Sequence, residues 1–399
     1  MLAARQLVRR LASSARQVRI PAVYMRGGTS KGVFFAKSDL PAGSAQRDKA
    51  LLRVIGSPDP YEKQIDGMGG ATSSTSKVVL LSPSERDDCD VDYLFGQVLI
   101  DQPQVDWSGS CGNLTAAVGP CAIRQGLVRD VPHDGLATVR IWQANVQKKI
   151  IAHVPMSGGE VQELGDFELD GVTFPAAEVR LDFLDPGASG AMLPTGAAMD
   201  RLAVPGLGDV DMTLLNAGNP TVFVDASTLH LRGTELQGDV NNDSELLARC
   251  EAVRAHAAVA MGLAESAAYA SEFRQHTPKI AFVGLPAPYT ASSGKAVAAG
   301  DTDLLVRILS MGKLHHAMTG TGAVAIATAA AIPGTILSTA LGGPRSSIRF
   351  GHPSGVLRVG ADTKEGPNGW EVTKVAMSRS ARRLMEGWVL VPSSAGLEP

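Results

Sequence analysis

Several residue types and patterns are scarce in this chain of 399 residues. Aromatic residues make up only 5% of it, which leaves little surface on which nucleic-acid bases could stack. The 37 lysines and arginines are balanced by 40 aspartates and glutamates, and a net charge of -3 provides no basic field for a nucleic acid. No long apolar run is free of polar or turn residues, so we expect neither a nucleic-acid partner nor a membrane span.

Metal-binding and disulfide patterns are also missing. The four cysteines, Cys89, Cys111, Cys121 and Cys250, have wide and irregular spacings that match neither a disulfide framework nor a zinc motif. The eight histidines include no pair spaced for metal binding on one helix face, and the acidic residues do not cluster around them. We therefore expect four free thiols, no metal site and no cofactor.

The N-terminal segment contains no acidic residue, and the first one in the chain is Asp39. Arginines at positions 5, 9, 10, 16 and 19 alternate there with apolar residues, a composition typical of a mitochondrial or plastid transit peptide. The alternative is a basic surface tail. We therefore exclude residues 1–18 from the fold and expect a location in the mitochondrial matrix, with the cytoplasm as the alternative.

The length of the chain and its apolar content of 44% predict two domains. A cluster of proline and glycine at residues 186–190 is the expected linker, which places the first domain at 19–187 and the second at 188–399. Whether the final strand returns to the first domain stays open.

Hydrophobic periodicity predicts a mixed α+β chain. Strands are expected at 19–25, 33–36, 77–81, 90–100, 138–142, 148–154, 179–183, 211–215, 221–224, 279–283 and 303–309. Helices are expected at 47–55, 114–123, 244–261 and 323–332, the third of them beginning at a Ser244 cap.

The most informative stretch is Trp107-Ser-Gly-Ser-Cys-Gly-Asn113, a glycine-rich turn that leads directly into the apolar helix at 114–123. Free N–H groups at a helix start bind anions, and the helix dipole favours a thiolate at Cys111. Cys121, by contrast, lies deep in the apolar run. Cys111 is therefore the candidate reactive cysteine, and the alternative is an ordinary strand-to-helix turn.

The same pattern recurs in the second half, where Met318-Thr-Gly-Thr-Gly322 leads into another helix of small apolar residues. The two turns are about 208 residues apart, which predicts two similar halves. A helix that is apolar all round has to be enclosed, and a curled sheet can enclose it. Two such helices would point their N-termini at one cleft, which would suit a di- or tricarboxylate.

Two other loops combine glycines, hydroxyls and cations. Arg26-Gly-Gly-Thr-Ser-Lys-Gly32 is either an anion-facing loop or a polar hairpin turn. Gly67–Lys77 is rich in backbone N–H groups and hydroxyls and precedes a strong strand. Lys77 at the start of that strand is either an edge-strand lysine or a buried base.

Four motifs in order, at residues 26–32, 67–77, 110–113 and 216–220, resemble the 2-methylaconitate cis-trans isomerase family, also called PrpF-type. The resemblance implies a diaminopimelate epimerase-like fold, in which two similar domains each wrap a central helix in curved β-sheet around an interdomain active site. It also implies that Lys77 and Cys111 act in catalysis. Unlike the epimerases, this chain carries Thr319 and Gly320 in the second turn in place of a cysteine, so we expect no mechanism based on two thiols.

The expected substrate-binding residues are distributed over these turns. They are Arg26, Thr29, Ser30, Gly70, Ser73, Gly112, Asn113, Asn219, Lys279, Thr319, Gly320 and Thr321. Arg26 and Lys279 are candidate carboxylate clamps, with ordinary surface charges as the alternative. Asn219 is equally a turn former, and His315 and His316 are equally surface residues or catalytic ones.

The resemblance implies a cofactor-independent isomerase of small aconitate-type tricarboxylates, with 2-methylaconitate cis-trans isomerisation in propionate breakdown as the first hypothesis. A neutral Lys77 would remove a proton beside a carboxylate, and N–H groups of Gly112, Asn113 and residues 319–322 would stabilise the resulting charge. The alternatives are an aconitate or 4-oxalomesaconate isomerase of the same family, a non-catalytic partner of an aconitase-type dehydratase, and a cysteine hydrolase, whose motifs are missing. A homodimer is a further expectation.

Overall fold

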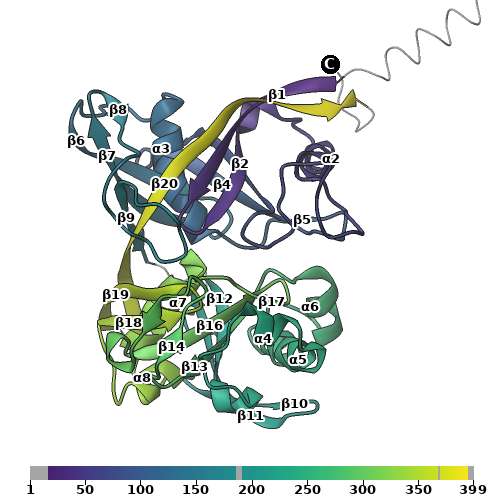
Figure 1. The fold of residues 1–399 in the computed structure, drawn as a ribbon, viewed down its shortest axis with the longest axis vertical. Helices are drawn as coiled ribbons and strands as arrows, with labels where there is room; N and C mark the ends of the chain where they lie inside the picture. The colour runs from purple at the N-terminus through teal and green to yellow at the C-terminus, as the bar shows by residue number, and fades with distance from the viewer. Residues whose placement is uncertain (1–16, 186–190, 367–368, 394–399) are drawn as a thin grey trace, which may run out of the picture.

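The computed structural model describes residues 17–185, 191–366 and 369–393. Figure 1 shows two lobes stacked along the long axis, with the final strand β20 (Gly369–Pro392) passing from the lower lobe into the upper one. The expected linker at 186–190 and most of the N-terminal segment lie outside the described residues. The boundary at residue 18 is wrong by two residues, because Gln17 and Val18 pair with Pro392 and Val391 in the sheet.

The upper lobe holds the first half of the chain and the end of β20. Its strands are β1 (Gln17–Gly27), β2 (Ser30–Ala36), β3 (Lys77–Pro83), β4 (Val91–Val98), β5 (Val105–Asp106), β6 (Gly135–Gln143), β7 (Lys148–Ser157), β8 (Glu160–Val161) and β9 (Glu178–Leu184). Its helices are the 3-10 turn η1 (Lys37–Asp39), α2 (Ser44–Ile55) and α3 (Gly112–Arg124).

The lower lobe holds the second half. Its strands are β10 (Asp200–Val204), β11 (Gly208–Ala217), β12 (Asn219–Asp225), β13 (Lys279–Gly284), β14 (Tyr289–Thr290), β15 (Ala296–Val297), β16 (Leu304–Ser310), β17 (Lys313–Leu314), β18 (Ser347–His352) and β19 (Gly355–Gly366). Its helices are η2 (Ala226–Leu229), α4 (Gln237–Asn241), α5 (Ser244–Ala260), α6 (Ala267–Phe273), η3 (Ala299–Asp301), α7 (Gly320–Ala331) and α8 (Ile336–Ala340).

Each strand and helix expected from periodicity has a counterpart whose ends differ by a few residues. After residue 332 the sequence predicted only a final strand, without bounds, and the chain forms α8, β18, β19 and β20 there. The final strand β20 pairs with β9 and β1 of the upper lobe. The long β20 lacks a clean period-two pattern because it carries several charged residues and pairs in turn with β19, β9 and β1. The fold is therefore mixed α+β and dominated by sheet.

One order of strand pairing occurs twice in the chain. In the upper lobe β1 pairs antiparallel with β2, β2 parallel with β3, β3 antiparallel with β4, β4 parallel with β6, and β6 antiparallel with β7. In the lower lobe the same sequence of relations links β11, β12, β13, β16, β18 and β19. Elements at matching places in the two lobes can therefore be compared directly.

The two apolar helices occupy matching places in this repeat. Residues 112–122 of α3 are all buried, and so are all residues of α7. Helix α3 packs against β1, β7 and β20, and α7 packs against β11, β12 and β19. Small side chains such as Ala116 and Ala325 let the strands approach closely, and a helix without a polar face has to be covered in this way. Residues of both helices belong to one apolar core cluster.

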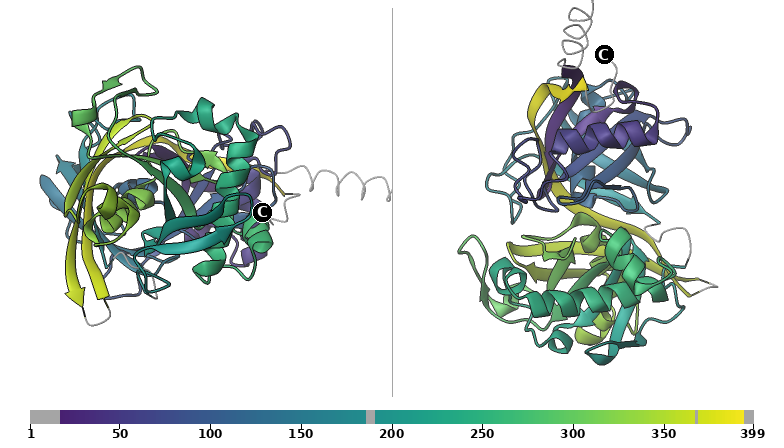
Figure 2. Two further views of the ribbon diagram at one scale, coloured as in Figure 1. Left: turned by 90° about the horizontal axis from the view of Figure 1, so that it is seen from below. Right: turned by 90° about the vertical axis from the view of Figure 1, so that its right-hand side faces the viewer.

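Two further helices, α2 and α5, lie on the same side of the molecule, one on each lobe (Figure 2). Their apolar faces close two smaller core clusters. The expected Ser244 cap of α5 is wrong by one residue, because the Asp243 carboxylate accepts a hydrogen bond from the backbone N–H of Leu246 at 2.9 Å. No helix among the described residues is long and apolar enough to cross a membrane.

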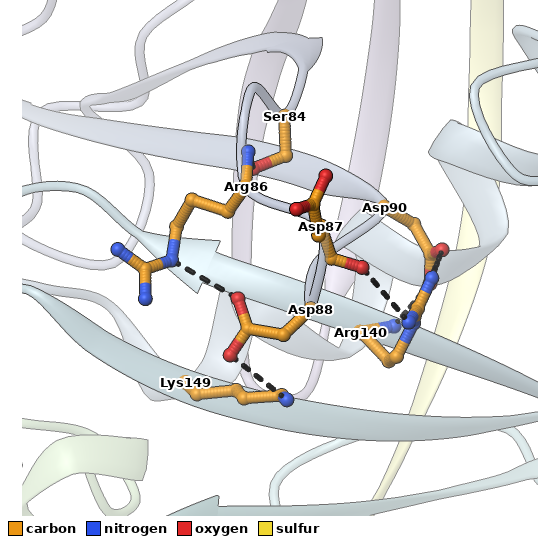
Figure 3. Close-up of polar contacts among 7 residues, drawn as sticks. All are labelled: Ser84, Arg86, Asp87, Asp88, Asp90, Arg140 and Lys149. Atoms are coloured by element: carbon orange, nitrogen blue, oxygen red, sulfur yellow. Dashed lines mark hydrogen bonds and ion pairs between the residues drawn. The ribbon is translucent and has the colours of Figure 1, made fainter.

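A group of ion pairs on the upper lobe ties the β3–β4 connection to β6 and β7 (Figure 3). The Asp90 carboxylate accepts hydrogen bonds from the guanidinium of Arg140, the shortest at 2.5 Å, and from the Arg140 backbone N–H at 2.7 Å. Asp88 accepts from Arg86 at 3.2 Å and from Lys149 at 3.3 Å. Asp90 is 12% exposed whereas Asp88 is 52% exposed, so the Asp90–Arg140 pair is the stronger contributor.

The N-termini of α3 and α7 meet backbone to backbone at the junction of the lobes. A Cβ atom on Gly320 would lie 2.3 Å from the carbonyl carbon of Gly112 and 2.4 Å from the Asn113 nitrogen. A Cβ atom on Gly112 would lie 2.7 Å from the carbonyl carbon of Gly320. Neither glycine has a positive φ. The close approach of the two helices, and not backbone freedom, therefore requires glycine at both positions.

Because the two helix ends are in close contact, we predict that Gly320→Ala destabilises the protein. The added methyl group forces the two helix ends apart, and we expect the free energy of unfolding to fall by about 1–3 kcal/mol. Urea unfolding monitored by circular dichroism measures the change. Gly300→Ala is the control, because nothing lies within 4 Å of a Cβ atom there, and its effect should stay within about 0.5 kcal/mol. Equal effects of the two substitutions would contradict the role given to the helix contact.

Candidate functional site

A small cavity, called here the helix-junction cavity, lies where the two helices meet. Its volume is about 10 Å³, about enough for one water molecule. Both expected catalytic residues and most of the expected substrate-binding residues line it. The lining residues are Ser30, Ser73, Lys77, Ser110, Cys111, Gly112, Asn113, His276, Lys279, Ser310, His315, Thr319, Gly320 and Thr321.

Cys111 is the N-terminal cap of α3. Its Sγ atom accepts a hydrogen bond from the Leu114 backbone N–H at 3.4 Å, and its carbonyl oxygen accepts from the Tyr93 hydroxyl at 3.1 Å. Cys121, further along the same helix, is buried, and burial raises the pKa of its thiol to about 12. All four cysteines are free, as expected. The structure thus separates a thiol at the cavity from one inside the core.

Lys77 is the first residue of β3 and lies between β2 and β4, so the edge-strand interpretation is wrong. Only 5% of the residue is exposed. Its Nζ atom donates to the Gln97 Oε1 atom at 2.6 Å and lies 4.9 Å from the centre of the Phe95 ring. Burial lowers the pKa of Lys77, and a negative charge on Cys111 opposes that shift. Within the described residues no carboxylate pairs with this amine.

Lys279 is the first residue of β13 and is 2% exposed, so it is not an ordinary surface charge. Its Nζ atom donates to the Ser310 Oγ atom at 3.0 Å. Burial and, secondly, the positive charge of Lys77 lower the pKa of Lys279 to about 7. The cavity therefore holds two buried amines, one from each lobe.

Two histidines also reach the cavity. His315, whose role the sequence left open, is buried, and its Nδ1 atom accepts from the Ala317 N–H at 3.1 Å. His276 was missed by sequence reasoning, because no local pattern marks it and only tertiary contacts with Asn219 and Phe95 bring it here. Burial lowers the pKa of both histidines well below the usual value, so both are neutral near pH 7.

Asn113 joins the turns that surround the cavity. Its Nδ2 atom donates to Thr29 Oγ1 at 3.0 Å and to the Met318 carbonyl oxygen at 3.1 Å, and its Oδ1 atom accepts from Arg379 Nε at 3.1 Å. The Thr319 hydroxyl caps α7 by accepting from the Gly322 N–H at 3.0 Å. Contacts from both lobes thus hold the two helix starts in place.

Arg26 and Thr29 line a different, larger cavity of about 450 Å³. Ser30 lines both cavities, so the two are adjacent. The Arg26 guanidinium donates to the carbonyl oxygens of Gly28 at 3.1 Å and Ser380 at 2.9 Å, and burial lowers its pKa to about 10. Arg382, on β20, brings a second cation to this cavity.

Two expected substrate-binding residues line neither cavity. Gly70 is exposed. Asn219 is fully buried and uses its amide on the backbone of Ser110, accepting from the Ser110 N–H at 2.8 Å and donating to the Ser110 carbonyl oxygen at 2.9 Å. Asn219 therefore positions the turn before Cys111 from the opposite lobe. Among the described residues no group of three His, Cys, Asp or Glu side chains could hold a metal ion.

The fold has known counterparts. The structure of a probable proline racemase from Agrobacterium radiobacter, 14% identical, superposes with a TM-score of 0.55 over 95% of this chain and 96% of that one. This likeness places the chain in the epimerase-like class of folds. The crystal structure of a methylitaconate-delta-isomerase, 39% identical, superposes with a TM-score of 0.75 over 96% of this chain and 98% of that one.

Sequence comparison identifies the protein family to which the chain belongs within this class of folds. The model of the PrpF protein family matches residues 17–392. A 2-methyl-aconitate isomerase from Cupriavidus necator is 62% identical over 392 residues, which cover 95% of this chain and 98% of that protein. The chain therefore belongs to the PrpF protein family, as its motifs predicted.

Because Asn219 bonds the backbone of Ser110, we predict that Asn219→Ala destabilises the protein. Asn219→Ala leaves the buried N–H and carbonyl groups of Ser110 without their partners, so we expect the free energy of unfolding to fall by about 1–3 kcal/mol. Guanidinium unfolding measures it. The exposed Asn242→Ala is the control and should change stability by less than about 0.5 kcal/mol. If Asn219→Ala kept full stability and lost only substrate affinity, Asn219 would be a ligand and not a positioning residue.

Proposed function

We propose that this chain is a cofactor-independent isomerase of aconitate-type tricarboxylates that interconverts the cis and trans forms of 2-methylaconitate. The single observation that carries the proposal is the helix-junction cavity, where a buried amine and a thiol meet two helix N-termini. The name of the 62% identical relative supports the choice of substrate, and the family members reported above with more than 25% identity are isomerases. That this chain is an isomerase follows from its family.

We further propose that the lobes are two domains, divided within residues 186–190, and that the reaction takes place between them. Each would enclose one apolar helix in curved sheet, α3 in the first domain and α7 in the second. The repeated order of strand pairing supports this division. The contact between Gly112 and Gly320 supports a reaction site at the interface.

In the proposed mechanism the neutral amine of Lys77 removes a proton from the substrate carbon next to a carboxylate and conjugated with the double bond. The C–H bond breaks, an N–H bond forms, and the electron pair spreads through a dienolate onto the carboxylate. The double bond thereby loses its double-bond character and can rotate before a proton returns to carbon. Burial favours the neutral amine that this step requires.

Backbone N–H groups of the two helix starts would stabilise the charge on the carboxylate. The caps occupy the N–H groups of Leu114 and Gly322, which leaves the first-turn groups of Gly112, Asn113 and Thr321 for the substrate. Two helix dipoles with their positive ends at one point favour the same anion. Cys111 lies at the same junction, where it would assist as the acid or as a second base.

The substrate needs more room than the helix-junction cavity offers. A volume of about 10 Å³ cannot hold a tricarboxylate, so binding must widen the junction between the lobes. The adjacent larger cavity, with Arg26 and Arg382, would receive the carboxylate arms that lie away from the reacting carbons. Ser30 lies between the two regions.

The aconitate and 4-oxalomesaconate alternatives require the same base and the same carboxylate sites, and differ only in what packs around the alkene substituent. They remain predictions. A homodimer and a complex with an aconitase-type dehydratase also remain predictions. No surface among the described residues points to either partner.

The proposal predicts the behaviour of Lys77→Gln. Loss of the base should lower kcat by at least about 10²-fold, whereas binding of a carboxylate ligand should persist. NMR in deuterated water, with cis and trans 2-methylaconitate and aconitate, reports the products and the carbon that gains deuterium. The control is Lys49→Gln on the exposed face of α2, which should retain wild-type rates. Near-normal turnover by Lys77→Gln would remove the lysine from the mechanism.

The location of the protein is a separate proposal. The arginine-rich segment precedes the part of the chain that matches the family, which supports a transit peptide, whereas the bacterial source of the relative favours the cytoplasmic alternative. We expect a fusion of residues 1–30 with a fluorescent reporter to enter mitochondria in eukaryotic cells. A diffuse signal would decide for the cytoplasm.

A further inference from the structure

We propose that His315 is a further substrate-binding residue, which donates its Nε2 hydrogen to the carboxylate on which charge gathers while Lys77 holds the proton. This inference rests on the proposed isomerase function and deepens it, because it adds a side-chain donor to the backbone N–H groups of the helix starts.

The imidazole of His315 lies where the two cavities meet. It lines the helix-junction cavity, and the next residue, His316, lines the larger cavity. The two rings stack with their centres 4.7 Å apart and their planes 25° apart. A tricarboxylate that reaches from the helix starts into the larger cavity, as proposed above, therefore lies beside this pair of rings.

One hydrogen bond fixes which nitrogen of His315 carries the hydrogen. The Nδ1 atom accepts from the Ala317 backbone N–H at 3.1 Å. A backbone N–H can only donate, so Nδ1 has to offer its lone pair, and in a neutral ring the hydrogen is then on Nε2. The structure thus selects one tautomer, in which Nε2–H is the donor.

This donor lacks an acceptor in the described part of the chain, where the bond to Ala317 is the only side-chain hydrogen bond of His315. Only 4% of the residue is exposed, so bulk water hardly reaches the ring. A buried donor without an acceptor is costly, and such a group in a native protein calls for a functional explanation. A substrate carboxylate in the adjoining cavity would be the acceptor.

The surroundings of His315 suit a donor that stays neutral. Burial lowers its pKa well below the usual value, and positive charges on His316, Lys77 and Lys279 act in the same direction. Two lysines and two helix N-termini already favour an anion at the junction. A neutral N–H group therefore adds a hydrogen bond to the carboxylate without adding another buried charge.

Three contacts hold the ring in place, so the donor needs no rearrangement as charge develops. The His315 backbone N–H donates to the Ile308 carbonyl oxygen at 2.9 Å, Ala317 binds Nδ1, and His316 stacks on one face. The bond from a fixed donor strengthens as the electron pair of the broken C–H bond moves onto the carboxylate. The Nε2–H bond stays intact, and the proton held by Lys77 returns to carbon.

The test compares His315→Asn with His315→Gln in the full chain, using cis and trans 2-methylaconitate as substrates. Asparagine can place its oxygen near the position of Nδ1 and keep the bond to Ala317, but it has no donor at the position of Nε2. Glutamine can place a donor near Nε2 but loses the bond to Ala317. We expect kcat to fall by about 10²-fold in His315→Asn and to stay within about tenfold of wild type in His315→Gln. Urea unfolding should show the opposite order, with His315→Gln as the less stable variant.

His230→Asn is the matched control. His230 is exposed on the lower lobe and has a left-handed φ of 61°, which asparagine also adopts readily. This variant should keep the wild-type kcat and unfold at the wild-type urea concentration.

A direct measurement uses the wild-type chain and so does not depend on the activity or stability of a variant. The probe is tricarballylate, a saturated tricarboxylate that has no double bond and therefore cannot isomerise. In protein labelled with a heavy nitrogen isotope in histidine, the signal that either variant lacks belongs to His315. We expect NMR to show the hydrogen of His315 on Nε2, and its signal to move downfield when tricarballylate binds.

Three results would overturn the inference. One is wild-type turnover by His315→Asn. Another is a kcat of His315→Gln at or below that of His315→Asn, which would limit His315 to holding the backbone of Ala317. The third is an unchanged Nε2–H signal in a chain that binds tricarballylate by calorimetry. Failure of the proposed function looks different, because the wild-type chain itself would then leave both forms of 2-methylaconitate unconverted.

Discussion

The whole arrangement depends on one close contact, the meeting of the α3 and α7 N-termini through Gly112 and Gly320. Helix starts carry unpaired N–H groups and partial positive charge, so bringing two of them together costs electrostatic energy unless an anion lies nearby. The sheets on both sides enclose the helices, and Asn113 and Asn219 fasten the turns of one lobe to the other. The contact therefore favours an anion at this point, which supports the carboxylate site proposed above.

The second feature of the site is that burial lowers the pKa of its two lysines. Lys77 and Lys279 are buried with neutral hydrogen-bond partners, and the two histidines at the cavity are neutral. Removing amines from water favours their uncharged form, and a second amine nearby adds to that preference. Burial therefore lowers the pKa of both amines at the junction, while the guanidinium of Arg26 lines the larger neighbouring cavity.

Much of this site could be recognised before the structure. Cys111 was marked by a glycine turn in front of an apolar helix, and the pattern at Thr319 repeated it, because helix starts have local signatures. His276 and Ser310 carry no such signature. The sequence left Asn219 equally a ligand or a turn former, and only the structure shows that its amide bonds the Ser110 backbone; it also shows that Gly70, expected in an anion loop, lines neither cavity. The local sequence identifies a candidate side chain, but contacts with distant segments of the chain decide where that side chain points.

The amino-acid sequence by itself determined the local elements, since periodicity, caps and glycine turns act over a few residues. It also determined the family, through four motifs in order. The tertiary structure decided that the side chains of Lys77 and Lys279 line the same cavity, because strand register sets the face on which each side chain lies. Lys77 and Lys279 begin strands far apart in the chain, and only the repeated pairing of β3 and β13 with their neighbours brings both amines to one cavity.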